Sequence, residues 1–494
     1  MLTTGAHAQT PDTPGAEAPT QTPEPIIDAE DAQAMASEEE AEVEEVVVTG
    51  TSIRGVAPAG SPVLAITPEQ IQNNPATTAT ELLRQLPQVF NLGASDTQFT
   101  ASNNANANVT GGSGINLRGL GTEATLTLVD SRRMPAAGTM AQYFDPSVIP
   151  TMAIGRIEVL ADGGSAIYGS DAVGGVVNIL LRRNFQGLEL SARYGFADGL
   201  DQTVLGGVFG HKWSGGGLMV AVEYNERSNL LASERDFYTD DLRPFGGTDQ
   251  RSFNANPGNI QVGNTRYAIP AGQNGRALTP AQLIPGTANR RSAFFEADAL
   301  PAQERLTSAF TFDHDLTDRI SFSAQGIFAK REFVRGQGNF TSNLTVPRSN
   351  PFFVHPTNPA APNVTVNYSF NEDFGRSERV ADSDFRFVTG NFDVELGADW
   401  SATAYASHGE DTENSFASSV NTAALNRALA DPNAATAFNP FGAGSNTPQA
   451  TLDLIEARFR IASEYTLEEF GVTANGPVFT LPGGEVRAAI GLSR

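Results

Sequence analysis

Apolar and polar residues alternate with a period of two through much of the second half of the chain. At residues 187–196, for example, Leu188, Leu190, Tyr194 and Phe196 are separated by polar or small residues. A β-strand points successive side chains to opposite faces, so this pattern predicts strands with one apolar and one polar face. We predict about nine such strands from the pattern, near 187–196, 203–212, 217–228, 303–313, 319–332, 382–395, 400–411, 467–479 and 485–493.

The connections between these strands fall into two length classes that alternate along the chain. Tight turns are expected at 213–216, 314–318, 396–399 and 480–484, and long loops at 229–302, 333–381 and 412–466, with 197–202 the one short loop of the second class. Alternation alone also fits a soluble β-sandwich. Structureless loops this long are uncommon in compact soluble domains, whereas outer-membrane barrels combine short turns with long external loops.

Trp213 and Trp400 fall beside predicted short turns, where an aromatic girdle of a barrel is expected. We therefore predict that residues 184–494 form an antiparallel transmembrane β-barrel whose outer face contacts outer-membrane lipid. Plugged barrel transporters have roughly 22 strands, so this barrel is expected to be incomplete and the sequence to be a fragment.

A different pattern occupies the segment from Gly111 to Arg183. Short β-rich runs at 125–130, 157–160 and 176–181 are separated by glycine-rich turns. Upstream, a strand is expected at 61–66, a helix after the N-cap residue Thr67, and a second short helix at 80–86. These elements predict a compact α+β unit.

The segments 115–121, 125–135 and 154–181 resemble the plug domain of TonB-dependent outer-membrane receptors. Several separated matches in the same order are more specific than one motif, and the matching positions are Asn116, Arg118, Gly119, Gly121, Tyr168 and Gly169. The resemblance implies a plug domain at 51–183. Where the family commonly has Leu-Arg-Gly, this chain has Leu160, Ala161, Asp162 and Gly163, so the contact usually made by that arginine is in doubt. Arg118 is a candidate for a similar ion pair.

An acidic segment precedes this unit. The net charge is −24, and residues 1–45 hold 12 carboxylates and no Lys or Arg. Residues 9–42 contain too few large apolar side chains to form a core and are expected to be a disordered acidic linker. An acidic tail that serves only solubility is the alternative. Residues 1–8 end in a small-x-small pattern, Ala6 to Ala8, that suggests a possible signal-peptide remnant.

A short β-branched run follows the linker within residues 43–50. It resembles a TonB box, a segment that binds TonB by adding a strand to the edge of a TonB sheet. The resemblance assigns TonB binding to Glu45, Val46, Val47, Val48 and Thr49. A first strand of the plug is the alternative interpretation.

The composition excludes several kinds of chemistry. The chain has no cysteine, and its five histidines show no ligand spacing, so we expect no metal site and no cofactor. The negative charge argues against nucleic acid as a partner. The glycine-rich segment 162–175 lacks a following Gly-Lys-Ser/Thr and precedes a strand, which argues against a phosphate-binding loop.

Aromatic residues follow a proline in each of the three long loops. If they line an external vestibule, they would contact a ligand; alternatively, they pack each loop onto itself. The candidate ligand contacts are Phe245, Phe352, Phe353 and Phe441.

The resemblance implies a transport protein of the Gram-negative cell outer membrane and not an enzyme. A small-molecule ligand of the siderophore–iron, saccharide or cobalamin class would bind loops and plug, and TonB, with its proton-driven inner-membrane complex, would pull on the TonB box. A signal-transducing receptor is an alternative, but it needs a folded domain ahead of the box, and residues 9–42 are too few and too polar to fold. A non-transporting outer-membrane β-protein would have no use for a strand on an acidic linker.

Overall fold

The computed structural model describes residues 49–50, 63–90, 108–162, 164–482 and 484–494. The predicted signal-peptide remnant, the acidic linker and residues 45–48 of the predicted TonB box lie outside these residues. Within the described part of the chain, no helix is both long enough and apolar enough to cross a membrane.

The residues from 63 to 181 form an α+β unit, here called the N-terminal unit, around a five-stranded sheet. The strands lie in the order β1 (Val63–Ile66), β4 (Ile154–Leu160), β5 (Gly175–Leu181), β2 (Thr125–Val129) and β3 (Arg132–Arg133). β2 and β5 are parallel, and the other neighbours are antiparallel. β2, β4 and β5 are mostly buried, as expected for strands covered on both faces. The predicted α+β architecture is confirmed.

Short helices connect these strands. They are α2 (Pro68–Gln72), α3 (Ala79–Leu83), α4 (Ser165–Tyr168) and the 3-10 turns η1 (Thr122–Ala124), η2 (Pro146–Val148), η3 (Thr151–Ala153) and η4 (Ser170–Ala172). Thr67 caps α2 because its hydroxyl accepts the N–H of Gln70 at 3.4 Å, and Pro68 occupies the first turn. Thr78 caps α3 in the same way through Glu81.

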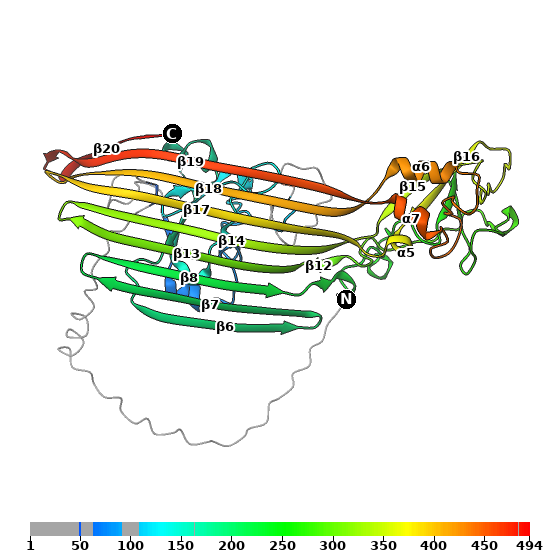
Figure 1. The fold of residues 1–494 in the computed structure, drawn as a ribbon, viewed down its shortest axis with the longest axis horizontal. Coiled ribbons are helices and arrows are strands. Elements are labelled where there is room, and N and C mark those ends of the chain that lie inside the picture. Colours follow the sequence, from blue (N-terminus) through cyan, green and yellow to red (C-terminus); the bar gives the residue numbers. More distant parts are fainter. Residues whose placement is uncertain (1–48, 51–62, 91–107, 163, 483) are drawn as a thin grey trace, which may run out of the picture. The chain divides into compact units, whose positions relative to one another are not determined.

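A nine-stranded antiparallel sheet, here called the large sheet, follows the N-terminal unit (Figure 1). Its strands pair in chain order: β6 (Gly187–Ala197), β7 (Leu200–Trp213), β8 (Gly216–Arg227), β13 (Ala302–Thr317), β14 (Ile320–Gly338), β17 (Ser377–Gly397), β18 (Trp400–Val420), β19 (Glu456–Leu481) and β20 (Gly484–Ser493). The predicted strand number and the short turns are confirmed. Trp213 and Trp400 lie at the short-turn ends of β7 and β18.

The two faces of the large sheet differ as the alternation predicts. Large apolar side chains are exposed on the outer face, including Phe196 and Leu492, each 81% exposed. The inner face carries buried polar side chains such as Thr311 and Gln325, each 1% exposed. An apolar outer face and a polar inner face are typical of transmembrane barrel strands.

Four strands of the large sheet, β14, β17, β18 and β19, run further toward the long connections than the apolar pattern indicates. β14 continues to Gly338 and β19 begins at Glu456, where neither face is continuously apolar. At this end β18 carries consecutive polar residues, from Glu410 to Asn414, that still pair with both neighbouring strands. Backbone hydrogen bonds between strands do not require apolar side chains, so strand pairing continues beyond the residues that alternate.

The three long connections are folded, contrary to the expectation of structureless loops. They contain the pair β9 (Leu230–Leu231) and β12 (Asp298–Leu300), the 3-10 turns η5 (Ala232–Glu234), η6 (Arg243–Phe245) and η7 (Pro280–Gln282), and a second, four-stranded sheet. That sheet has the order β11 (Thr265–Ala268), β10 (Asn259–Val262), β16 (Asn363–Ser369) and β15 (Thr341–Pro347), and it is accompanied by α5 (Asn371–Phe374), α6 (Thr422–Ala430) and α7 (Gln449–Ile455). We call the four-stranded sheet and α5–α7, with the segments that join them, the loop module.

The loop module has its own apolar core. The core draws on all three connections: Ile260 comes from the first, Tyr368 from the second and Phe438 from the third. The rings of Tyr368 and Phe438 lie 5.6 Å apart in an edge-to-face arrangement, which is a favoured geometry for aromatic pairs. Burial of apolar side chains from three separate segments explains why these connections fold together.

Candidate functional site: the contact of the N-terminal unit with the large sheet

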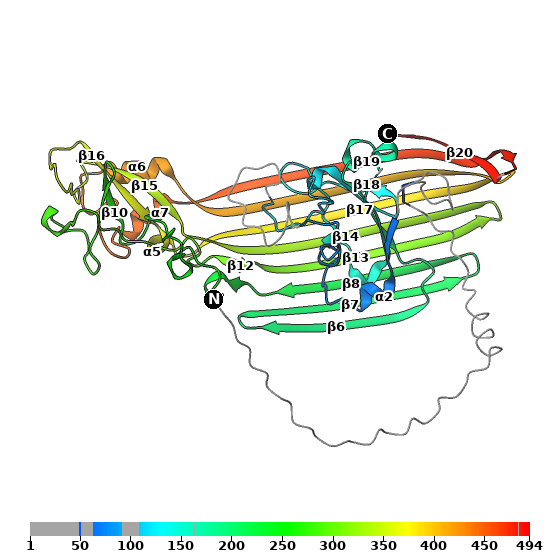
Figure 2. The same cartoon turned by 180° about the vertical axis from the view of Figure 1, so that it is seen from behind.

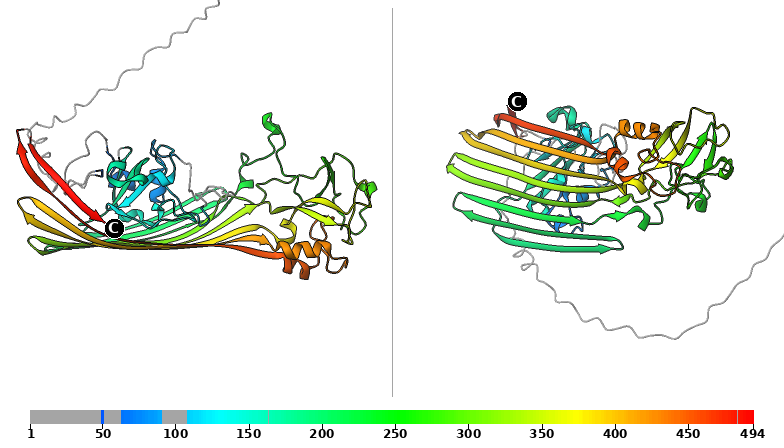
Figure 3. Two further views of the ribbon diagram at one scale, coloured as in Figure 1. Left: turned by 90° about the horizontal axis from the view of Figure 1, so that it is seen from above. Right: turned by 45° about the vertical axis from the view of Figure 1, so that its right-hand side comes forward.

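The N-terminal unit lies against the polar inner face of the large sheet (Figures 2 and 3). Part of this contact is apolar. The rings of Phe144 and Phe385 lie 5.8 Å apart. Met152 of η3 packs so closely on β7 that a Cβ at Gly206 would lie 2.7 Å from its sulfur. Glycine at position 206 therefore allows η3 to approach the strand.

A buried ion pair occupies the centre of the contact. Asp145, which caps η2, pairs with Arg331 of β14, and their side chains are only 2% and 4% exposed. Beside them, the hydroxyl of Thr110 donates to Glu413 of β18 at 2.6 Å. Burial raises the pKa of Tyr143 well above its ordinary value, and the nearby carboxylates of Glu413 and Asp145 raise it further. The tyrosine therefore stays neutral among these charges.

Arg183 links the end of the N-terminal unit to the inner face. Its guanidinium pairs with Asp313 of β13, lies 3.1 Å from Asp130, and donates to Gln325 of β14 at 2.9 Å. Burial raises the pKa of Asp130, and the Coulombic attraction of Arg183 opposes that shift. One arginine thus holds a turn of the N-terminal unit and two strands of the large sheet together.

Two further polar contacts join the N-terminal unit to the inner face of the large sheet. We call this set of polar contacts the seat of the unit. The guanidinium of Arg132 lies 3.4 Å above the ring of Tyr405 and donates to Asn391 at 2.7 Å. The backbone N–H of Thr151 donates to Glu223 of β8 at 3.1 Å, and its hydroxyl donates to the same carboxylate oxygen. Beside the apolar part of the contact, these hydrogen bonds and ion pairs fix position and direction.

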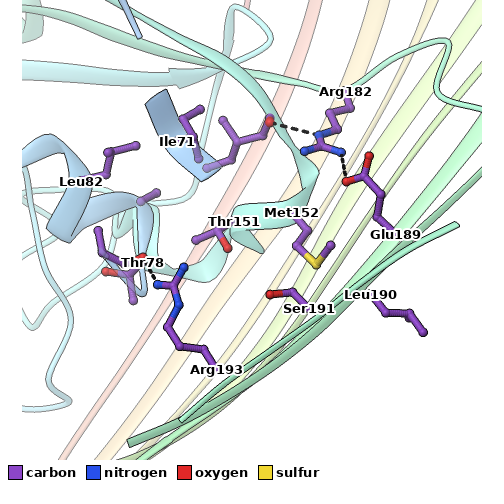
Figure 4. A pocket seen from close by; sticks show the side chains of 13 residues that line it. Ile71, Thr78, Leu82, Thr151, Met152, Arg182, Glu189, Leu190, Ser191 and Arg193 are labelled. Carbon is purple, nitrogen blue, oxygen red and sulfur yellow. Dashed lines mark hydrogen bonds and ion pairs between the residues drawn. The ribbon is translucent and has the colours of Figure 1, made fainter. Parts of the chain in front are cut away.

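A cavity of about 300 Å³ lies beside β6, between that strand and the helices of the N-terminal unit (Figure 4). Arg193 of β6 reaches across it and donates to the carbonyls of Pro75 and Ala76 at 2.9 and 3.1 Å. Arg182 pairs with Glu189 at 2.8 Å on the same side. The cavity is a gap in the packing around α2 and α3, bridged by charged side chains.

The motif residues predicted from the sequence have structural roles in the N-terminal unit. Asn116 is buried and accepts the N–H of Gly121, whose φ is 109°. Gly119 and Gly169 also have positive φ, which side chains other than glycine rarely adopt. Arg118 donates to the carbonyls of Val173 and Gly174 at 2.6 and 3.2 Å, so the candidate plug-to-barrel arginine holds two turns of its own unit together.

Thr49 is the one residue of the predicted TonB-binding set that the structure describes. It is buried on the sheet of the N-terminal unit, where its N–H and its hydroxyl donate to Glu158 of β4 at 3.0 and 2.5 Å. The side chain of Asn178, on β5, donates to the same hydroxyl at 3.1 Å. The next N–H, of Gly50, donates to the Tyr168 hydroxyl at 3.4 Å. Residue 49 therefore contacts both central strands of the unit.

The four candidate ligand-contacting phenylalanines do not share one environment. Phe352 and Phe441 are 5% and 0% exposed in the core of the loop module, and Phe353 packs against that core. Phe245 alone of the four is largely exposed. Phe352 and Phe441 pack the loops together in this structure, and contact of the four phenylalanines with a ligand remains a prediction.

Sequence reasoning missed the residues that seat the N-terminal unit. Arg331 and Glu413 are charges at inward positions of strands, which is a signal that could have singled them out. Their partners, Asp145 and Thr110, lie more than 180 residues away, so the pairs could not be read from the sequence. Within the described residues, no group of three or more His, Asp or Glu side chains is arranged to hold a metal ion.

Comparison with known families identifies the N-terminal unit. Residues 56–176 match the family described as TonB-dependent Receptor Plug Domain. The chain carries a TonB-dependent receptor plug. It is followed by the nine-stranded antiparallel sheet, which resembles part of a barrel. Plug-domain receptors are transporters or receptors rather than enzymes, and members of the family are Gram-negative outer-membrane proteins that work with TonB.

Some solved structures of bacterial receptors show a weak likeness to the chain. A ferric enterobactin receptor variant from Pseudomonas aeruginosa is 14% identical with a TM-score of 0.39, over 88% of this chain and 57% of that protein. The ferric preacinetobactin receptor of Acinetobacter baumannii is 11% identical with a TM-score of 0.40, over 88% and 60%. A siderophore receptor of Pseudomonas aeruginosa is 14% identical with a TM-score of 0.32, over 87% and 64%. The chain thus spans 57–64% of the length of these proteins.

Proposed function

We propose that the protein imports a scarce small molecule across the outer membrane of a Gram-negative bacterium, driven by TonB. The plug is the moving part, and the large sheet is part of the wall that it closes. The observation that carries the proposal is the polar seat of the family-matched plug on the inner face of the large sheet, centred on Asp145 and Arg331.

A polar seat suits a plug that must move and return. Hydrogen bonds and ion pairs have direction, so they define one seated position. Water can replace each of them when the plug shifts, and the net contribution of a typical hydrogen bond is then only about 0.5–1.5 kcal/mol. An interface made only of apolar side chains would lose the whole hydrophobic contribution on opening, with no comparable replacement.

Thr49 gives the proposed pull a route into the plug. TonB would pair with residues 45–48 by strand addition, the mode in which main-chain hydrogen bonds supply affinity. Tension on these residues reaches Thr49 and, through it, Glu158 of β4 and Asn178 of β5. Those two strands are the centre of the plug sheet, so force applied at the box acts on the plug core.

The outer face of the large sheet suits lipid. Phe196, Leu492 and many other large apolar side chains are exposed on it, and a polar environment would leave that area unfavourably hydrated. We place this face against the acyl chains of the outer membrane, with the short turns and the two tryptophans on the periplasmic side and the loop module outside.

The ligand belongs to one of three classes: siderophore–iron, saccharide or cobalamin. The solved receptors named above are described as receptors for siderophores, which makes ferric siderophores one class to test. Accumulation of ferric siderophores, cobalamin and oligosaccharides in a deletion strain and its parent identifies the class. The solute whose accumulation the deletion removes then serves as the ligand in the next experiment.

Proline substitutions test the TonB-box assignment. Val47→Pro and Val48→Pro each remove an N–H donor, on opposite edges of the strand, whereas Val47→Ala keeps both edges intact. We expect energised uptake to fall at least about tenfold in a proline variant, with little change in Val47→Ala and normal ligand binding to cells in all three. Normal uptake in both proline variants would contradict the assignment. Loss of binding together with uptake would instead make this segment the first strand of the plug.

A further inference from the structure

The sheet of the loop module has one apolar and one polar face. The apolar face, with Ile260, Tyr267 and Val366, is buried in the module core. Period-two alternation turns the intervening residues to the opposite face, where Gln261 faces Arg266 across β10 and β11, and Asn367 faces Asn343 across β16 and β15. This polar face forms the floor of a cleft of about 340 Å³.

A row of side-chain amides crosses the floor of the cleft. The amide nitrogen of Asn367 donates to Gln261 at 3.2 Å and to Asn343 at 2.9 Å, so both of its N–H groups are used. The Asn367 side-chain oxygen is buried, and no described residue donates a hydrogen bond to it, although the residue is only 3% exposed.

Two arginines form a wall above the floor. Their guanidinium carbons lie close to the centre of the Phe253 ring, Arg266 at 3.7 Å and Arg290 at 4.1 Å. Arg290 is held further by donating to the carbonyls of Asp249 and Arg251 at 3.0 and 2.9 Å. The Nε of Arg266 is buried, and no described residue accepts its hydrogen. The stacking therefore holds the guanidinium of Arg266 in one orientation beside the cleft.

The charge of the cleft is opposite to that of the whole chain. Three arginines and one aspartate line it, in a protein of net charge −24. The aspartate, Asp249, is occupied by Arg251, which donates to both carboxylate oxygens at 3.0 and 2.9 Å. Arg290 also lies 3.6 Å from Asp249. Arg266 is therefore the arginine of the cleft for which the described residues supply no carboxylate partner.

From this arrangement we propose that the cleft binds an acidic saccharide, with sugar hydroxyls on the amide row and a carboxylate at Arg266. Sugar hydroxyls both donate and accept hydrogen bonds, as the amides of the row do, and a carboxylate pairs with the guanidinium of Arg266. The volume lies at the small end of the range of about 300–1,000 Å³ for ligand pockets, which suits one or two sugar rings.

The site deepens the proposed function, because an importer with this cleft would capture its ligand on the loop module before the plug moves. Binding to the cleft does not require TonB, so the proposal and the transport function can fail independently. Transport could be absent while the purified protein still binds the sugar, and the reverse result is equally possible.

Calorimetry on the whole protein purified in detergent tests the site with three probes: digalacturonate, the neutral disaccharide galactobiose, and succinate as a carboxylate without sugar hydroxyls. We expect digalacturonate to bind at least about tenfold more tightly than galactobiose, with no measurable succinate binding. No digalacturonate binding at concentrations up to about 10 mM, equal binding of galactobiose, or comparable succinate binding would each overturn the proposal.

Matched variants locate the binding. Arg266→Gln should lower the affinity for digalacturonate at least about tenfold. The affinity for galactobiose should fall much less, because only the acidic sugar loses an ion pair. Asn343→Ala removes an exposed amide of the row. It should lower the affinity for both sugars by a similar factor, which is smaller than the factor expected for digalacturonate in Arg266→Gln. Arg276→Gln, an exposed arginine of the same module outside the cleft, is the control and should change neither affinity. Unchanged digalacturonate affinity in Arg266→Gln would place the ligand elsewhere.

Discussion

The plug–sheet contact and the loop module both join segments far apart in the chain, but they differ in their share of polar contacts. The plug meets the large sheet through a shared apolar cluster and also through buried polar pairs such as Asp145 with Arg331 and Thr110 with Glu413. The loop module instead meets in an aromatic core around Tyr368, Phe370 and Phe438. Apolar burial is strong and needs no direction, so it favours a permanent assembly. Polar contacts define a position and can exchange with water, so they favour a part that is placed accurately and can leave.

The largest effect is expected when an aromatic ring is removed from the core of the loop module, because this should destabilise the module and leave the plug unchanged. Phe438 is fully buried, and Phe438→Ala should destabilise the loop module by about 3–5 kcal/mol, since the lost ring leaves a cavity. Hydrogen exchange of peptides from 421–455 should rise, while plug peptides that include β2 keep their protection. Phe245→Ala, at an exposed phenylalanine, is the control. A similar rise in plug exchange would mean that the two regions do not assemble independently.

The second variant removes one charge from the plug seat. Asp145→Asn keeps the shape and the side-chain oxygen that caps η2 but leaves Arg331 buried without its closest counter-charge. Loss of one partner of a buried pair costs about 3–5 kcal/mol, part of which Glu413 should recover here. Plug release, followed by labelling of a cysteine placed at Thr110, should occur at lower urea concentration. Arg133→Gln removes an exposed ion pair with Asp171 and is the control. It should change the free energy of plug release by less than about 1 kcal/mol.

A smaller effect distinguishes the two regions by pH. Burial raises the pKa of Asp373 in the loop module to about 6; hydrogen bonds from Ser445 and Tyr368 oppose the shift, and Glu372 adds to it. The raised value means that the neutral form is preferred in the folded module. The favourable contribution is therefore complete below the ordinary value of 3.8 and is lost as the pH rises through about 6.

We accordingly expect the free energy of opening of the loop module to fall by at most roughly 3 kcal/mol between about pH 4 and pH 7. Resistance of the module to proteolysis measures this free energy. Asp373→Asn should make the resistance nearly independent of pH in that range. A protease with constant activity over the range, or correction by an unfolded substrate, is the necessary control. An equal pH dependence in wild type and variant would remove Asp373 as the cause.

Much of the fold could be predicted from the sequence because it depends on local patterns. Period-two alternation gave the nine strands and their faces, and the N-cap Thr67 marked the start of α2 in the plug. The loop module could not be predicted, because its core residues lie in three connections without a common period. Ile260 and Phe438, for example, share one cluster although β13, β14, β17 and β18 lie between them in sequence.

The candidate sites show the same division. Asn116, Gly121 and Tyr168 were found because their motif is local, and the structure places them within the plug. The seat and the cleft were missed because each depends on pairs across the fold. Arg266 has its role only once Phe253 and Arg290 lie beside it, and nothing in its own neighbourhood of the sequence indicates the stack.

The most direct test of the central claim, that the plug must move on the large sheet for transport, is a reversible lock between them. Met152 Cγ lies 3.4 Å from the position of a Cβ at Gly206, so cysteines at these two positions should be able to form a disulfide, in a chain that has no other cysteine. In cells that express the Met152→Cys, Gly206→Cys variant, we predict normal ligand binding but no energised uptake when the pair is oxidised, and recovery after reduction. The Met152→Cys single variant, which keeps Gly206, should transport in both states. Full uptake with the disulfide formed in every molecule would contradict the account.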